Sequence, residues 1–327
     1  MIIFAGKAQK LFSMFFNKII WNPSEGIDLG FFTLHFYSLM FVIAFTLGFY
    51  LMKQIYIREN IEQEKLDSIF IYAALATLIG ARLGHVFFYD WGYFKNNLLE
   101  IFLPVRFSPK FEFTGFRGLA SHGAAIAFIV AMYYYAKKVI HKPPLWVMDR
   151  VTIPAAFGGI FVRIGNFINS EIIGEPVQSD VATGVKFVKA DLSQYDAVKS
   201  TGIQNVSKAY DAIVSNPEYS QILESIPYRH PAQLYEAFGY IFVSLILYFI
   251  YWKTSYRNRL GFMFGMYLVL IWTVRFLVEY VKKSQGGFED ALGDSLSTGQ
   301  WLSIPFILVG LYFIFRAKKR TPADADL

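Results

Sequence analysis

The sequence predicts an all-α polytopic membrane protein with seven transmembrane helices and a small outward-facing head inserted between helices four and five. Two observations carry this prediction. Of the 327 residues, 55% are hydrophobic and only 17% are charged, against about 25% in soluble domains. The apolar residues also gather into runs of roughly 20 residues, the length that crosses a bilayer as a helix.

Seven apolar runs are predicted to be the spans: 34–52, 69–89, 118–135, 151–168, 234–252, 261–281 and 296–315. The fourth and seventh contain Pro154 and Pro305, which membrane helices tolerate with help from their neighbours. Segment 1–21 mixes Phe, Ile and Leu with lysines, which fits a helix lying in the membrane interface better than a cleavable signal.

The polar insertion 170–230 lowers the mean hydropathy to +0.37, and its mixed Val, Tyr, Asp and Ser content predicts a small folded head. The predicted organisation is an interfacial segment 1–33, spans one to four in 34–169, a periplasmic head 170–230, spans five to seven in 231–315, and a cytoplasmic tail 316–327.

Basic residues beside the spans predict the orientation. The more basic side carries Lys53, Arg58, Lys65, Lys137, Lys138, Lys142, Arg150, Lys253, Arg257, Arg259, Arg316, Lys318, Lys319 and Arg320, and the other side carries Lys18, Lys95, Arg106, Lys110, Arg117, Lys282 and Lys283. The positive-inside rule places the first group in the cytoplasm. The C-terminus is therefore predicted to be cytoplasmic, and the N-terminus and the head to be outside.

Composition also excludes several functions. The chain has no cysteine, so a disulfide, a thiolate metal site and a Cys nucleophile are excluded. The net charge of +6 is spread over loops, as expected from topology and anionic lipids, and not from nucleic-acid binding. The five histidines lack paired ligand spacing, so a metal site is not expected.

Polar side chains inside the spans are the candidate functional groups, because each costs several kcal/mol unless it faces a partner or water. They are His35, Tyr37, Arg82, His85, His122, Arg163, Asn166, Asn169, His230, Gln233, Glu236, Arg275 and Glu279. With the predicted orientation nearly all the ionisable ones fall in the outer halves of their helices, which predicts one cavity open to the outer leaflet. The cytoplasmic halves are expected to hold almost nothing ionisable.

Spacing leaves alternative roles open. Arg163, Asn166 and Asn169 share one helical face, and Arg275 and Glu279 stand four residues apart. The latter two could form a structural ion pair, or the arginines could bind a phosphate, for which a guanidinium is well suited. His122 stands among small residues and could be structural or could move a proton near neutral pH.

Several motifs occur together. The run Arg163-Ile164-Gly165-Asn166-Phe167-Ile168-Asn169-Ser170-Glu171 precedes Gly174, and it is accompanied by 34–37 (Leu-His-Phe-Tyr), 80–84 (Gly-Ala-Arg-Leu-Gly), 122–123 (His-Gly), 229–236 (Arg-His-Pro-Ala-Gln-Leu-Tyr-Glu), Arg275 with Glu279, and 297–305 (Ser-Thr-Gly-Gln-Trp-Leu-Ser-Ile-Pro). In this order they resemble the bacterial prolipoprotein diacylglyceryl transferases.

The resemblance implies an enzyme of the bacterial inner membrane. Such an enzyme transfers the diacylglyceryl group of phosphatidylglycerol to the lipobox cysteine of a prolipoprotein signal peptide and releases glycerol phosphate. No metal or organic cofactor is implied. By resemblance His122 is the candidate base, and Arg163 and Arg275 clamp the phosphate. Glu279 holds Arg275, and the substrate-binding residues are His35, Tyr37, Arg82, Asn166, Asn169, Glu171, Gly174 and Glu279.

This chain departs from the family pattern at a few positions. It has Ala124 where a second glycine commonly follows His122, Val162 before Arg163, and Lys282 where an arginine often stands. None of these removes a residue to which the resemblance assigns chemistry, so they bear on roles and rates more than on the reaction.

Two other classes compete with the transferase. An anion or lipid transporter would place charges at the midplane and contain an inverted repeat, and the sequence shows neither. A non-catalytic scaffold for signal peptides would need the arginines but would tolerate the loss of His122.

The sequence generates one test. We expect His122→Gln and Arg163→Ala each to abolish most diacylglyceryl transfer, measured on purified protein, whereas Lys53→Ala retains it. Normal turnover by folded His122→Gln protein would remove His122 from the catalytic role.

Overall fold

A computed structural model describes residues 19–30, 33–103, 105–107, 110–113, 118–177, 183–283 and 296–317. The chain divides into two compact units. The first unit comprises residues 1–46, 155–249 and 265–312, and the second comprises 47–154, 250–264 and 313–327. The boundaries between the two units fall within five of the long helices.

The seven predicted spans are confirmed as helices that are long and apolar enough to cross a bilayer. They are α2 (Phe36–Arg58), α3 (Gln63–Phe88), α5 (Ser121–Tyr135, continued by a π-helical turn to Ile140), α6 (Pro144–Ile168), α11 (Ala232–Lys253), α12 (Phe262–Val278, continued by a 3-10 turn to Val281) and α14 (Thr298–Arg316). The chain is therefore a multi-pass membrane protein.

The helix ends are set by local backbone chemistry. His141 ends the helix that begins with α5 in the left-handed conformation (φ 53°), and Pro144 begins α6 two residues after Lys142, as its fixed φ favours at a first helical position. Gly261 adopts φ 85° just before α12, where a side chain is disfavoured. These local signals, and not the limits of the apolar runs, determine where the helices begin and end.

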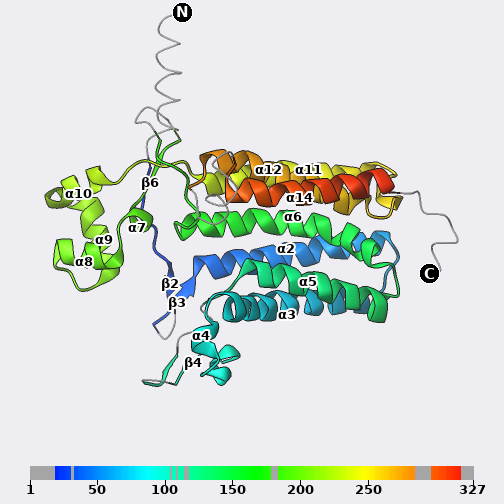
Figure 1. The fold of residues 1–327 in the computed structure, drawn as a ribbon, viewed down its shortest axis with the longest axis horizontal. Helices are drawn as coiled ribbons and strands as arrows, with labels where there is room; N and C mark the ends of the chain where they lie inside the picture. Colours follow the sequence, from blue (N-terminus) through cyan, green and yellow to red (C-terminus); the bar gives the residue numbers. More distant parts are fainter. Residues whose placement is uncertain are drawn as a thin grey trace, which may run out of the picture. The chain divides into compact units, whose positions relative to one another are not determined.

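In the first unit, α11, α12 and α14 lie side by side (Figure 1). The backbone at Gly239 packs against Val274 so closely that an added Cβ would lie 2.5 Å from that side chain. The rings of Trp272 and Phe306 stack with centroids 4.1 Å apart. Small residues and stacked aromatic rings thus bring these helices together without a hydrophobic effect between them.

The predicted head region contains α7 (Val188–Asp191), α8 (Gln194–Thr201), α9 (Val206–Ser215) and α10 (Ser220–Ser225). Ser193 and Asn205 cap α8 and α9 by accepting the backbone N–H groups of Asp196 and Lys208. A core of buried residues holds the helices together: Val188, Ala197, Ala209, Tyr210, Ile213 and Ile226. A bidentate ion pair of Arg229 with Asp191, at 2.7 Å, joins the head to the segment that enters α11.

The predicted interfacial helix over 1–21 is wrong at its end. Residues Ile19–Trp21 form strand β1, which pairs in parallel with β6 (Val185–Phe187). Trp21 also donates from its indole N–H to the Phe167 carbonyl at 2.9 Å. The rest of that segment, 1–18, lies outside the described residues. Strands β2 (Gly26–Asp28) and β3 (Thr33–His35) then form an antiparallel pair that leads into α2.

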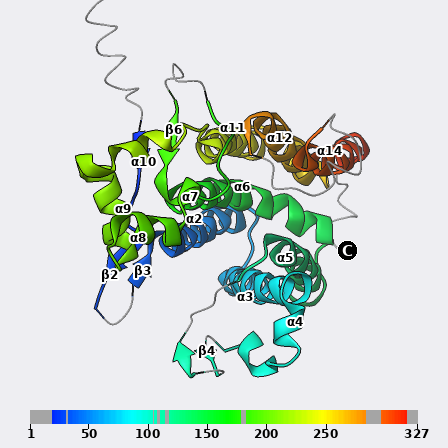
Figure 2. The same cartoon turned by 60° about the vertical axis from the view of Figure 1, so that its left-hand side comes forward.

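In the second unit, α3 and α5 lie side by side, with Gly80 and Gly84 of α3 against Gly123 of α5 (Figure 2). A Cβ at Gly123 would lie 2.2 Å from the Gly80 carbonyl oxygen and 2.6 Å from the Gly84 Cα. After α3 the chain forms α4 (Trp91–Phe94), the 3-10 turn η1 (Leu98–Ile101) and the antiparallel pair of β4 (Val105–Arg106) with β5 (Glu112–Phe113).

The start of α6 differs from the start of the predicted fourth span. This helix begins seven residues before the predicted span, and it buries Asp149 (0% exposed) and Arg150 (3% exposed). The sequence predicts Arg150 as a basic residue beside the fourth span, because the apolar run begins only at Val151.

The glycine contact generates a stability test. Gly123→Ala is expected to lower the free energy of unfolding by about 1–3 kcal/mol, because two helix backbones must separate to admit the methyl group. Thermal unfolding in detergent measures the change. The matched control is Gly92→Ala, since a Cβ there meets nothing within 4 Å. Equal unfolding temperatures for the two variants would contradict a close contact between α3 and α5 at Gly123.

Candidate active site

Arg163 lies at the centre of a buried polar group in the first unit. Its Nε forms an ion pair with Oε2 of Glu236, a carboxylate on α11 that is 1% exposed. Its Nη1 donates to Oδ1 of Asn166 at 3.3 Å, and its guanidinium carbon lies 6.0 Å from the ring centroid of Tyr240. Because Asn166 stands one turn further along α6, the predicted shared helical face is confirmed for these two residues, whereas Asn169 lies beyond the end of α6 at Ile168.

Glu171 stands in a strained turn where α6 ends. The residues on both sides of it, Ser170 and Ile172, have φ of 56° and 57°, a region that a β-branched residue such as Ile rarely occupies. The Glu171 carboxylate accepts Asn166 Nδ2 and Asn169 Nδ2, both at 3.2 Å. The Gln233 side chain donates to the Glu171 carbonyl at 2.5 Å. Two asparagine contacts thus aim an exposed carboxylate toward the Arg163 group.

Tyr37 approaches the same group from the first turn of α2. A Cβ on Gly165 would lie 2.7 Å from the Tyr37 ring, so the glycine admits the ring against α6. The Tyr37 hydroxyl interacts with Asn166, and electrostatically with Glu171 and Arg163. His35, two residues earlier, is exposed at the end of β3.

Arg275 on α12 has no carboxylate partner among the described residues. Its Nε is buried and makes no hydrogen bond, and its guanidinium carbon lies 4.9 Å from the ring centroid of Trp272. The hydroxyl-bearing ring of Tyr240 interacts electrostatically with both Arg275 and Arg163. One tyrosine therefore interacts with two guanidinium groups, of which only Arg163 has a carboxylate partner among the described residues.

Glu279 does not make the expected ion pair with Arg275. Its Oε2 instead accepts Lys282 Nζ at 2.9 Å, and both side chains are less than a tenth exposed. A Cβ on Gly299 would lie 2.3 Å from the Glu279 carboxylate, so the carboxylate lies against the backbone at the start of α14. The 3-10 turn that follows α12 carries Glu279 away from the ideal i,i+4 position.

Gly174 is enclosed by backbone on two sides. Its N–H donates to the His230 carbonyl at 3.0 Å, and a Cβ would lie 2.5 Å from that oxygen and 2.6 Å from the Val281 carbonyl oxygen. A side chain here would separate the segment after α6 from those before α11 and after α12. The role of Gly174 is thus to allow the close backbone approach that surrounds Glu171.

His122 and Arg82 belong to the second unit. His122 is the exposed second residue of α5, immediately before the buried Gly123. Arg82 is buried, donates to the carbonyls of Ile101 at 2.8 Å and Glu100 at 2.6 Å, and lies over the Phe94 ring. These contacts hold the turn η1 against α3, so the structure gives Arg82 a structural task beside its predicted role in binding.

Two residues of the group were missed as site residues by the sequence. Glu236 was recognised as a charged residue in a span but was not paired with Arg163, and Tyr240 was not considered. Their spacing of four residues places both on one face of α11, and this signal was available. Their contact with Arg163 on α6 depends on tertiary packing.

These features define a multi-pass membrane protein with a buried arginine–carboxylate site. The family model for prolipoprotein diacylglyceryl transferase matches residues 25–316. The chain belongs to this family.

Curated relatives support the assignment. A phosphatidylglycerol–prolipoprotein diacylglyceryl transferase of Bacteroides fragilis is 34% identical over 91% of this chain and 95% of its own length. The transferase of Tolumonas auensis is 34% identical over 92% and 98%, and that of Chloroherpeton thalassium is 32% identical over 94% and 97%.

The buried ion pair generates a second stability test. Glu236→Met alone should destabilise the protein by about 3–5 kcal/mol, because it leaves the Arg163 charge buried without its partner. The double variant Arg163→Met/Glu236→Met should recover most of that loss, since neither charge remains. Thermal unfolding in detergent measures both. A double variant less stable than the single one would show that the pair does not act as a unit.

Proposed function

We propose that this chain transfers the sn-1,2-diacylglyceryl group of phosphatidylglycerol to the lipobox cysteine of prolipoproteins, as the first step of bacterial lipoprotein maturation. The observation that carries the proposal is Arg275, a half-buried residue whose Nε is buried without a hydrogen bond and which has no carboxylate partner among the described residues. Tyr240 interacts with both Arg275 and Arg163. A guanidinium inside a span without a carboxylate partner favours an anionic ligand, and the relatives are named for phosphatidylglycerol, a phospholipid whose headgroup is joined by a phosphate diester.

The proposed step is a displacement at carbon. A base takes the proton of the substrate thiol, and the thiolate sulfur attacks glycerol C3 of the diacylglyceryl group. The new C–S bond is a thioether. The bond between C3 and the phosphate ester oxygen breaks. That oxygen keeps the electron pair and leaves as part of glycerol phosphate. The cysteine comes from the protein substrate, in keeping with a chain that contains none.

The named residues divide this work. Arg275 and Arg163 bind the phosphate and stabilise the charge that develops on the leaving group. His122, exposed at the start of α5 with no described partner, is the proposed base. Tyr37, Asn166, Asn169 and Glu171 orient the headgroup, and Gly174 keeps the backbone close to them.

The remaining predicted residues have supporting tasks. Glu279, paired with Lys282, borders the site at the start of α14, and His35 and Arg82 stay proposed substrate contacts. We place the protein in the inner membrane with its N-terminus and the periplasmic head 170–230 outside and the tail 316–327 in the cytoplasm. Its partners are phosphatidylglycerol, prolipoprotein signal peptides with a lipobox cysteine, and membrane lipid.

The test uses purified protein in detergent with phosphatidylglycerol and a short lipobox peptide, and follows the peptide mass. We expect the cysteine peptide to gain one diacylglyceryl group while glycerol phosphate is released, and a Cys→Ser peptide to gain nothing. Arg275→Ala should lower turnover about 100-fold or more, the magnitude found for losing a group that stabilises transition-state charge. Arg259→Ala, an exposed arginine, is the matched control.

Two results oppose the proposal. Absence of product from folded protein that binds the lipid would favour a scaffold or a transporter, which a flux assay then separates. Full turnover by Arg275→Ala would leave the reaction in place but assign the phosphate to other residues.

A further inference from the structure

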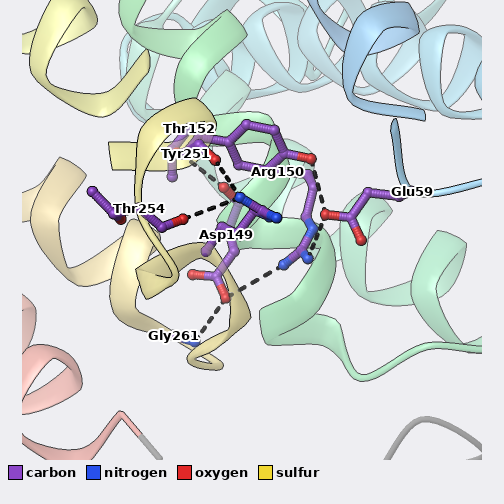
Figure 3. Close-up of polar contacts among 8 residues, drawn as sticks. Glu59, Asp149, Arg150, Thr152, Tyr251, Thr254 and Gly261 are labelled. Atoms are coloured by element: carbon purple, nitrogen blue, oxygen red, sulfur yellow. Dashed lines mark hydrogen bonds and ion pairs between the residues drawn. The ribbon is translucent and has the colours of Figure 1, made fainter. Parts of the chain in front are cut away.

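Four helix ends of the second unit meet in a buried polar cluster (Figure 3). Asp149 and Arg150 come from the first turns of α6, Glu59 follows α2 directly, Tyr251 lies near the end of α11, and Gly261 immediately precedes α12. None of these residues belongs to the candidate active site. Their function is therefore unassigned.

Asp149 caps a helix other than its own. Its Oδ2 accepts the Gly261 N–H at 2.7 Å, and its Oδ1 accepts the Phe264 N–H at 2.9 Å. Gly261 occupies the N-cap position of α12 but has no side chain, and Phe264 is the third residue of that helix. An N-cap side chain ordinarily supplies the acceptor for this N–H. Here a carboxylate from α6 supplies it, with both oxygens engaged and the side chain fully buried.

Arg150 anchors the same cluster on its other side. Its Nη2 forms an ion pair with Glu59 Oε1 at 2.8 Å, and that oxygen also accepts the Tyr251 hydroxyl at 2.9 Å. Its guanidinium carbon lies 4.4 Å from the ring centroid of Trp146. Arg150 thus joins α6 to α2 and α11, whereas Asp149 joins α6 to α12.

The Asp149 contact bears on the two proposed phosphate-binding arginines through the helices that carry them. Arg163 stands fourteen residues after Asp149 on α6, and Arg275 stands fourteen residues after Gly261 on α12. At 1.5 Å per residue both lie about 21 Å along their helices from the capping contact. A slip of one helix along the other by a single residue would displace one guanidinium by about 1.5 Å relative to its partner.

We propose that Asp149 is a positioning residue for the transferase reaction: by capping α12 from α6, it fixes the axial register of the helices that carry Arg163 and Arg275. This inference rests on the proposed function. Reaction rates respond steeply to such displacements, since a misplacement of about 1 Å can cost about 100-fold. The carboxylate is suited to the task because it satisfies two backbone donors at the positive end of the α12 dipole.

The first experiment measures the register directly. The chain has no cysteine, so Ala155→Cys on α6 and Leu277→Cys on α12, both exposed, accept one spin label each. We expect a narrow distance distribution in the parent protein and a distribution broadened or shifted by about 1.5 Å or more in Asp149→Ala. Glu59→Gln is the matched control, because it weakens the same cluster without touching α12. Equal distributions for Asp149→Ala and the parent would overturn the proposal.

The second experiment measures the consequence for turnover. Asp149→Asn should lower kcat at least tenfold and leave the KM for phosphatidylglycerol within threefold, while Glu59→Gln keeps kcat within twofold. In an Arg275→Ala background, Asp149→Asn should cost threefold or less, because the group it positions is gone. An equal fold-loss in both backgrounds would mean that Asp149 acts only on stability and would overturn the positioning role.

The two experiments separate the inference from the proposed function. If the parent protein transfers nothing, the proposed function fails, and the label distances alone decide whether Asp149 holds the register. A third outcome is that the label distances change in Asp149→Ala while the kcat of Asp149→Asn equals that of the parent protein. Asp149 then holds the register but positions nothing that the reaction needs, and the proposal is overturned.

Discussion

Burying charge in a membrane helix is the constraint on which the rest of this structure depends. A guanidinium in a span must find a carboxylate, an aromatic ring or a ligand. Arg163 finds Glu236, Arg150 finds Glu59, and Arg82 finds the carbonyls of a turn. Arg275 lies over the ring of Trp272 but has no carboxylate partner among the described residues. The unpaired arginine is thus singled out against paired ones in the same protein.

Backbone geometry holds the polar side chains of the first unit where they are needed. The strained turn around Glu171 persists because Gln233, Gly174 and the segment before α11 fix it from several sides. Strain of this kind costs free energy and survives only where surrounding contacts over-determine it. Glycines at 165 and 174 have the complementary task, since each admits a neighbour that a side chain would displace.

The two polar clusters differ in how their charged groups are partnered. Arg163 is paired with Glu236 and Arg275 has no carboxylate partner among the described residues, and the proposed phosphate binding rests on this difference. In the Asp149 cluster both carboxylate oxygens accept backbone donors, and the side chain is fully buried. Its contribution is geometrical, because the helix that receives its cap is the helix that carries Arg275.

The sequence by itself determined the seven spans, the polar residues inside them and the family motifs, because apolar runs and short motifs are local properties. It misplaced the start of α6, since Asp149 and Arg150 are polar by composition and buried only by partners from α2, α11 and α12. The family resemblance implied that Glu279 holds Arg275, whereas Glu279 stands in a 3-10 turn and pairs with Lys282. The pairings of Arg163 with Glu236 and of Arg150 with Glu59 were decided by tertiary packing alone, because these partners are far apart in the chain and their pairing leaves no periodic signal.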